Sequence, residues 1–237
     1  EKEVVIIEGG PGSGKTAVGI ESLLTAVNND MSRLAFVVRN AGLLQPLRKM
    51  LRRTGLTPFI KYPFEFVTQF ENASGNTYGS EDDSFDFVVV DETHRVPEFN
   101  RMYLTWPIKE EYQSGLTTVE EIVRCSRVSV FIIDPLQVVN PQTTDLDMVL
   151  EAAENHGARV TRYELPYQFR AGGSSQYLEW VESMIYPDES RPHFNLRPGS
   201  RTEPMRFNII DNPNDFHTMI EESKNNDIRM VSGYCWE

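Results

Sequence analysis

The chain has 237 residues, 40% of them hydrophobic, which is enough for the core of one large domain or two smaller ones. Its formal net charge of −12 excludes a surface coated with basic residues, although it allows a local basic track for phosphates. No apolar run reaches the length of a membrane span, and the first residues lack a signal-peptide layout. Cys125 and Cys235 show no metal-ligand spacing, so we expect buried free thiols and a cytoplasmic protein.

The first predicted elements are a strand over residues 4–7, a glycine-rich loop and a helix over 17–27. The loop reads Gly9, Gly10, Pro11, Gly12, Ser13, Gly14, Lys15 and Thr16. This fits the pattern G-x-x-x-x-G-K-[ST], in which backbone N–H groups surround a phosphate at a helix N-terminus. Lys15 would contact the β- and γ-phosphates, and the Thr16 hydroxyl would hold Mg²⁺. The pattern therefore predicts binding of a nucleoside triphosphate.

Two further strands are predicted over residues 33–38 and 64–68. Arg39 and Asn40 follow the first of them, and Thr68 ends the second. In a parallel sheet the carboxyl ends of neighbouring strands face a common cleft, where such side chains contact a nucleic-acid backbone. The same residue types also cap helices, and the sequence leaves both readings open.

A helix predicted over residues 43–54 carries the densest basic cluster of the chain. Its cations are either part of a nucleic-acid track or a solvated helix face near the negative end of the helix dipole. They are Arg48, Lys49, Arg52 and Arg53.

A buried strand predicted over residues 85–90 ends in Asp91 and Glu92. Parallel strands place such groups at the carboxyl edge of the sheet, where ligands of these folds bind. Asp91 is predicted to hold Mg²⁺ and Glu92 to polarise the attacking water. Acidic residues after a strand also serve as helix caps, but a phosphate loop some 75 residues earlier needs both groups and favours the catalytic reading.

After a helix predicted over 117–126, a strand over 128–133 ends in Asp134, Pro135, Leu136 and Gln137. In a nucleotide site Gln137 can sense the γ-phosphate and report its loss. Asp-Pro is also an ordinary turn opener, so the segment alone is ambiguous. A helix over 146–156 and a strand over 160–165 follow.

Strands and helices alternate along most of the chain, and this order continues in a helix over 175–185 and strands over 205–210 and 228–231. Such alternation predicts an α/β fold, a mostly parallel sheet with helices on both faces. Together with the phosphate loop, it predicts a P-loop NTPase.

The order of the motifs resembles that of superfamily-one helicases. A phosphate loop, a polar step after the second strand, an Asp-Glu-x-His box, an Asp-x-x-Gln and Gln168-Phe169-Arg170 follow one another. Within these helicases the chain resembles the Schlafen-like (group 3) DNA/RNA helicase domain family. The most specific matches are Gln168-Phe169-Arg170, the later Tyr177-Leu178-Glu179-Trp180 and the closing Val231-Ser232-Gly233-Tyr234-Cys235-Trp236.

This resemblance implies an ATP- and Mg²⁺-dependent motor that acts on DNA or RNA, with a single strand as the expected partner. It implies that Arg170 stabilises charge on the transferring phosphoryl group. It also implies a RecA-like domain over 1–165, a helical connection over 166–203 and the start of a truncated second RecA-like domain over 204–237. An incomplete second domain predicts weak hydrolysis by this piece.

Two motifs depart from the family pattern. Thr93 stands where the acidic box usually has Ala, which adds a hydroxyl and removes no acid. The third motif keeps only Asp134 and Gln137 of its usual polar residues. A different class of function also fits the acidic composition, namely a regulatory NTPase switch that controls a fused or associated effector.

Overall fold

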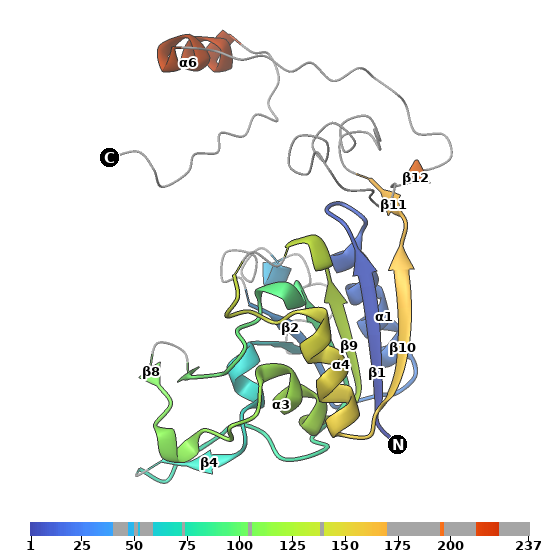
Figure 1. The fold of residues 1–237 in the computed structure, drawn as a ribbon, viewed down its shortest axis with the longest axis vertical. Helices are drawn as coiled ribbons and strands as arrows, with labels where there is room; N and C mark the ends of the chain where they lie inside the picture. Colours follow the sequence, from blue (N-terminus) through green and yellow to red (C-terminus); the bar gives the residue numbers. More distant parts are fainter. Residues whose placement is uncertain are drawn as a thin grey trace. The chain divides into compact units, whose positions relative to one another are not determined.

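A computed structural model of the chain describes residues 1–39, 47–49, 52, 59–72, 74–103, 106–137, 140–169, 195–196 and 212–222. Its centre is a six-stranded parallel sheet in the order β10-β1-β9-β6-β2-β3 (Figure 1). The strands are β1 (Glu3–Gly9), β2 (Leu34–Val38), β3 (Ile60–Lys61), β6 (Phe85–Asp91), β9 (Ser126–Ile133) and β10 (Arg159–Leu165). The predicted parallel α/β fold is confirmed, as are the strands predicted near residues 4–7, 33–38, 85–90, 128–133 and 160–165.

Helices cover both faces of this sheet (Figure 1). Helix α1 (Lys15–Asn28) packs on one face, and α3 (Thr118–Cys125) and α4 (Leu146–Asn155) pack on the other. Each strand divides its apolar side chains between the two cores, because successive side chains point to opposite faces. In β9, Phe131 and Ile133 contact the core under α3 and α4, whereas Val130 and Ile132 contact the core under α1.

Local sequence explains how these helices begin and how closely they pack. Thr117 and Glu120 form a capping box at the start of α3, and Asp145 accepts a hydrogen bond from the Met148 N–H at the start of α4. A Cβ at Gly19 of α1 would lie 2.8 Å from Ile132 Cδ1. Glycine at this position therefore lets α1 lie directly on the sheet.

The strand predicted over residues 64–68 is wrong. Residues Pro63–Phe66 form a short 3₁₀ helix, η2, and the sheet strand of this region is the earlier β3. Pro63 at the first helical position has a fixed φ and no N–H to donate to a sheet. The Glu65 carboxylate accepts from the Tyr62 N–H at 2.8 Å, which closes the turn locally.

Shorter elements connect the main ones. Between the principal strands lie β4 (Phe70–Glu71), β5 (Thr77–Tyr78), β7 (Met102–Tyr103), β8 (Trp106–Pro107), and the 3₁₀ turns η3 (Thr93–Arg95), η4 (Glu110–Tyr112) and η5 (Pro135–Gln137). After β10, β11 (Tyr167–Gln168) pairs in parallel with β12 (Asn195–Leu196). In the described part of the chain, no helix is long and apolar enough to span a membrane.

The chain divides into two compact units, Glu1–Thr202 and Glu203–Glu237. In the second unit the structure describes helix α6 (Pro213–Glu222) and the residue before it. The predicted elements over 175–185, 205–210 and 228–231 lie outside the described residues. Of the helix predicted over 43–54, residues 47–49 are described as helical.

Candidate functional site

Residues 9–16 form the turn that joins β1 to α1 at the carboxyl edge of the sheet. Gly12 and Gly14 have φ angles of +78° and +89°, a left-handed conformation that favours glycine. A Cβ at Gly9 would lie 2.5 Å from Ser13 Oγ, and that hydroxyl donates to the Gly10 carbonyl at 2.9 Å. The glycines of the motif are therefore required by the shape of this turn.

Lys15 is buried beneath the loop. Its Nζ donates to the Gly9 and Gly10 carbonyls at 2.9 and 2.8 Å, and it lies 3.6 Å from Asp134 Oδ2. These contacts hold the ammonium at the centre of the loop without any ligand. An anion that binds to the loop therefore meets a positive charge that is already in place.

Thr16 and Asp91 meet across the first turn of α1. The Thr16 hydroxyl donates to Asp91 Oδ2 at 2.7 Å. Burial raises the pKa of the Asp91 carboxyl above its ordinary value, and the hydrogen bond from Thr16 opposes that effect. A buried carboxylate that is costly to ionise is suited to binding a cation. Neighbouring ligands of an octahedral Mg²⁺ lie about 2.9 Å apart, so the two oxygens fit this ion.

Within the described residues, no group of three or more His, Cys, Asp and Glu side chains could hold a metal by itself. Mg²⁺ at nucleotide sites commonly takes one or two protein ligands and completes its shell with phosphates and water. The pair Thr16 and Asp91 is consistent with this second kind of site.

Glu92 has an uncommon backbone conformation, and its side chain contacts a buried histidine. Its φ and ψ angles are 52° and 47°, in the left-handed region. Its carboxylate lies 3.1 Å from His94 Nε2, off the line of a full hydrogen bond, and 3.0 Å from Arg95 Nε. Chiefly through the His94 ring, the pKa of Glu92 falls to about 2. Glu92 is therefore a fixed, ionised carboxylate beside Asp91.

His94 connects this carboxylate to the next strand of the sheet. The Asp134 N–H donates to His94 Nδ1 at 3.2 Å, and Gln137 Nε2 donates to Asp134 Oδ2 at 2.7 Å. Because Nδ1 accepts, the proton of the neutral ring resides on Nε2, which faces Glu92. Glu92, His94, Asp134 and Gln137 thus form one continuous chain of contacts. The two motifs were predicted separately from the sequence, and this link between them was not.

Phe169 is a further residue at the loop. Its N–H donates to the Gly12 carbonyl at 2.9 Å, and its ring lies near Gly14 and is 50% exposed. An adjoining cavity of about 320 Å³ is lined by Gly9, Asp134 and the ends of β1 and β10. The sequence signal that could have identified Phe169 was its place beside Arg170 in the Gln-x-Arg motif. Arg170 itself lies outside the described residues.

Of the residues predicted for nucleic-acid contact after the second and third strands, the structure describes Arg39 and Thr68, which do not line the same pocket. Arg39 is exposed at the carboxyl end of β2 and lines a separate pocket. Thr68 is also exposed, but it forms a bridge with Ser80 and does not line that pocket. Asn40 and Arg53 lie outside the described residues, and the structure leaves the role of the basic helix a prediction.

Comparison with known proteins gives a family match. None of the curated proteins matches the chain. A solved structure, APE1195, covers 85% of this chain and 88% of its own, at 13% identity and a TM-score of 0.31, a score too low to support any conclusion. The model of the family described as "Schlafen group 3, DNA/RNA helicase domain" matches residues 2–237. This match covers nearly the whole chain, so the protein belongs to the Schlafen group 3 DNA/RNA helicase domain family.

Proposed function

We propose that this helicase-family domain binds ATP with Mg²⁺ at the loop between β1 and α1, hydrolyses it, and uses the reaction to act on DNA or RNA. The observation that carries the proposal is the convergence of three features at one sheet edge. They are the preset ammonium of Lys15, the Thr16–Asp91 pair, and the ionised carboxylate of Glu92. Phosphoryl transfer requires a phosphate-binding cation, a metal site and a group that orients the attacking water.

The loop and Lys15 would bind the phosphates, and Thr16 and Asp91 would hold the Mg²⁺. When bound, the metal neutralises charge on the phosphate oxygens. The Thr16 hydroxyl and the Asp91 carboxylate, now paired at 2.7 Å, would both turn their oxygens to the cation. The half-exposed Phe169 ring beside the loop offers an apolar surface for the adenine base.

Glu92 would orient and polarise the water that attacks the γ-phosphate. A carboxylate with a pKa of about 2 is a weak proton acceptor but is ionised throughout the physiological range. Its contacts with His94 and Arg95 fix its direction. In a loose transition state, such positioning matters more than base strength.

Asp134 would report the state of the nucleotide. Its carboxylate faces Lys15 at 3.6 Å and Gln137 at 2.7 Å, and its N–H holds His94. A γ-phosphate that attracts Lys15 weakens the interaction of Lys15 with Asp134. The loss of that phosphate therefore changes the balance of contacts that reach Glu92 through His94.

The test is ATP hydrolysis by the wild type, Glu92→Gln and a control variant, Glu111→Gln, which removes an exposed carboxylate far along the chain. We expect Glu92→Gln to bind ATP normally and to lose about a hundredfold or more in turnover. Normal turnover by Glu92→Gln would show that another group orients the water.

Adding single-stranded DNA or RNA to the same assay tests the motor function. A nucleic-acid motor hydrolyses ATP faster when a strand is present. The net charge of −12 favours the alternative, a regulatory switch that controls a protein effector, and such a switch would be indifferent to the strand.

A further inference from the structure

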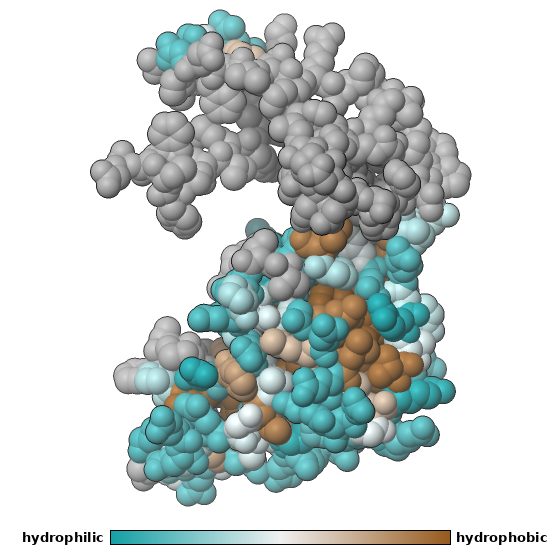
Figure 2. All heavy atoms as spheres, in the orientation of Figure 1, coloured by the Kyte–Doolittle hydropathy of each residue, from teal (hydrophilic) through white to brown (hydrophobic). Residues whose placement is uncertain are grey.

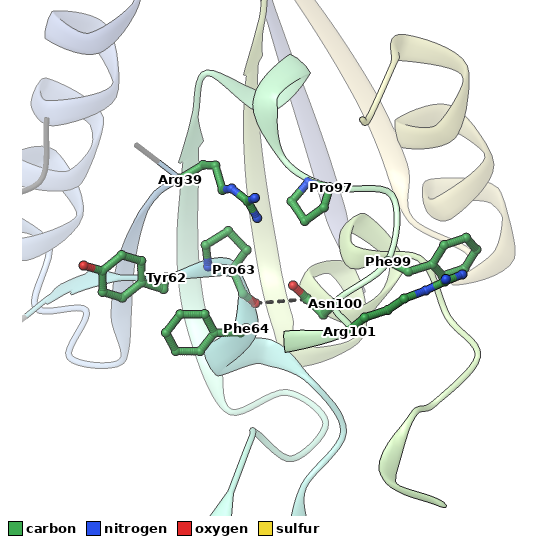
Figure 3. A pocket seen from close by; sticks show the side chains of 8 residues that line it. All are labelled: Arg39, Tyr62, Pro63, Phe64, Pro97, Phe99, Asn100 and Arg101. Carbon is green, nitrogen blue, oxygen red and sulfur yellow. Dashed lines mark hydrogen bonds between the residues drawn. The ribbon is translucent and has the colours of Figure 1, made fainter. Parts of the chain in front are cut away.

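A second pocket, of about 410 Å³, opens at the carboxyl ends of β2 and β3 (Figure 3). It is lined by Arg39, Tyr62, Phe64, Phe99, Asn100 and Arg101, together with two prolines. None of these residues belongs to the phosphate loop or lines the cavity beside it. The pocket is therefore a separate site on the same edge of the sheet.

The charged groups of the pocket are both cations. Arg39 and Arg101 are exposed, and among the described residues that line the pocket there is no carboxylate. In the described part of the chain neither guanidinium forms an ion pair. In a chain with a net charge of −12, this local concentration of unneutralised positive charge indicates an anionic ligand.

Aromatic rings flank the pocket on two sides (Figure 3). On one side the Tyr62 and Phe64 rings stack, with centroids 5.0 Å apart and planes inclined by 15°. On the other side the Arg101 guanidinium lies 5.4 Å from the centre of the Phe99 ring. Rings and guanidinium planes in a cationic groove are the surfaces on which unpaired bases stack.

Asn100 adds a hydrogen-bond acceptor in a fixed orientation. Its Nδ2 donates to the Pro63 carbonyl at 3.1 Å and to Glu121 Oε2 at 2.8 Å, which uses both amide hydrogens. Ser114 in turn holds the other oxygen of Glu121 at 2.8 Å. Asn100 Oδ1 has no partner among the described residues and is turned toward the side where Arg39 and Pro97 lie (Figure 3).

We propose that this pocket holds one unstacked base of a single-stranded DNA or RNA, a proposal that rests on the nucleic-acid function proposed above. Arg39 and Arg101 contact the flanking phosphates, and the base packs against Phe99 or the Tyr62 ring. Asn100 Oδ1 accepts from an exocyclic amino group. Adenine, cytosine and guanine carry such an amino group and thymine does not, so the pocket favours the first three over thymine.

The pocket wall is also tied to the acidic box. Residues 96–101 follow η3 directly, and hydrogen bonds fix them on both sides. Val96 O accepts from Thr144 N at 2.8 Å, and Glu98 O accepts from Thr118 N at 2.7 Å. A base in the pocket therefore contacts the direct continuation of the segment that contains Glu92 and His94.

The experiment measures binding of the full chain to fluorescein-labelled twelve-nucleotide strands by fluorescence anisotropy. The strands are oligo(dA), oligo(dC), oligo(dT) and an abasic strand of the same length. We expect the abasic strand to bind about tenfold or more weakly than oligo(dA), because base stacking is lost. Oligo(dT) should bind more weakly than oligo(dA) and oligo(dC).

Three variants locate the effect. Arg39→Ala should weaken binding of all strands alike and lower the salt slope by about one. Phe99→Leu keeps an apolar side chain and should shrink the difference between oligo(dA) and the abasic strand. The control Arg127→Ala removes an exposed cation at the amino end of β9, away from the carboxyl edge where the pocket opens, and should change neither.

Several outcomes would overturn the pocket. One is equal binding of abasic and base-containing strands by the wild type. Another is that Arg39→Ala and Phe99→Leu both bind the strands as the Arg127→Ala control does. A third is displacement of the strand by polyglutamate as readily as by oligo(dA), which would indicate a site for an acidic protein. If strands still stimulate ATP hydrolysis in these cases, only the proposed role of the pocket is refuted. If no strand binds to the protein or stimulates its ATP hydrolysis, the proposed nucleic-acid function is refuted as well.

Discussion

Substitution of His94 tests the chain of contacts from Glu92 to Gln137, because the two ring nitrogens contact different residues. His94→Asn keeps an acceptor near the position of Nδ1, so the Asp134 N–H retains a partner, but nothing reaches Glu92. His94→Gln places an amide nitrogen near the position of Nε2 and leaves the Asp134 N–H without its acceptor. The two variants therefore separate the contact with the Glu92 carboxylate from the hydrogen bond of the Asp134 N–H.

The magnitude for His94→Asn follows from the pKa of Glu92, which lies at about 2 instead of 4.5. That difference corresponds to at most about 3 kcal/mol. The carboxylate is 27% exposed and Arg95 also contacts it, so we expect a loss of about 1 kcal/mol in unfolding free energy. Because the folded-state pKa is lowered, this contribution is fully present above pH 4.5 and is lost as the pH falls toward 2.

The assay is urea unfolding of the wild type and both variants between pH 7 and pH 3, with ATP turnover measured alongside. The stability difference between the wild type and His94→Asn should be largest at pH 7 and should shrink as the pH falls below 4.5. His94→Gln should be destabilised by about 1–3 kcal/mol at every pH, the cost of an unsatisfied buried N–H. Turnover should fall up to about a hundredfold in His94→Asn and less in His94→Gln. A constant difference in stability for His94→Asn across this pH range would refute the link to Glu92.

Three further variants test other contacts of the site and core. Lys15→Ala should nearly abolish ATP binding in calorimetry, because it removes the ammonium at the centre of the loop; unchanged affinity would refute the site. Asp91→Asn should abolish Mg²⁺-dependent hydrolysis yet raise the unfolding free energy of the nucleotide-free protein at pH 7 by about 1 kcal/mol, since a buried charge is removed. Lower thermal stability than the wild type would contradict this reasoning. Gly19→Ala should cost about 1–3 kcal/mol in urea unfolding, because its Cβ would meet Ile132.

The sequence predicted β2, β6 and β9 because these strands are long, apolar and largely buried, which makes their pattern unambiguous. It failed at residues 64–68, where two phenylalanines and a valine suggested a strand. Pro63 and the local Tyr62–Glu65 contact instead stabilise a helical turn. Apolar content alone does not distinguish a strand from a short helix packed on the core.

The parts of the site that sequence reasoning missed depend on strand order. His94 and Asp134 are 40 residues apart and meet because β6 and β9 are neighbours in the sheet, with Val90 opposite Phe131. No spacing rule reports this neighbourhood. Likewise, Arg39 was a candidate from its place after a strand, but the rings beside it come from the start of η2 and from the bend at Phe99, which the sequence did not predict.

One segment, from Asp91 to Arg101, contains Glu92, which we propose orients the attacking water, and also forms a wall of the second pocket. Residues 118 and 142–144 hold its backbone through hydrogen bonds and a β-bridge. A displacement at one end of the segment should therefore move the other end as well. If both proposals hold, ATP and a single strand are coupled ligands, and thermodynamic linkage requires the coupling to be equal in both directions. The measurement uses Glu92→Gln, which should bind ATP without hydrolysing it. In this variant the strand should change the Kd for ATP by about 5- to 150-fold, and ATP should change the Kd for the strand by the same factor. Affinities that are independent of each other would mean that residues 96–101 do not transmit the occupancy of the pocket to Glu92.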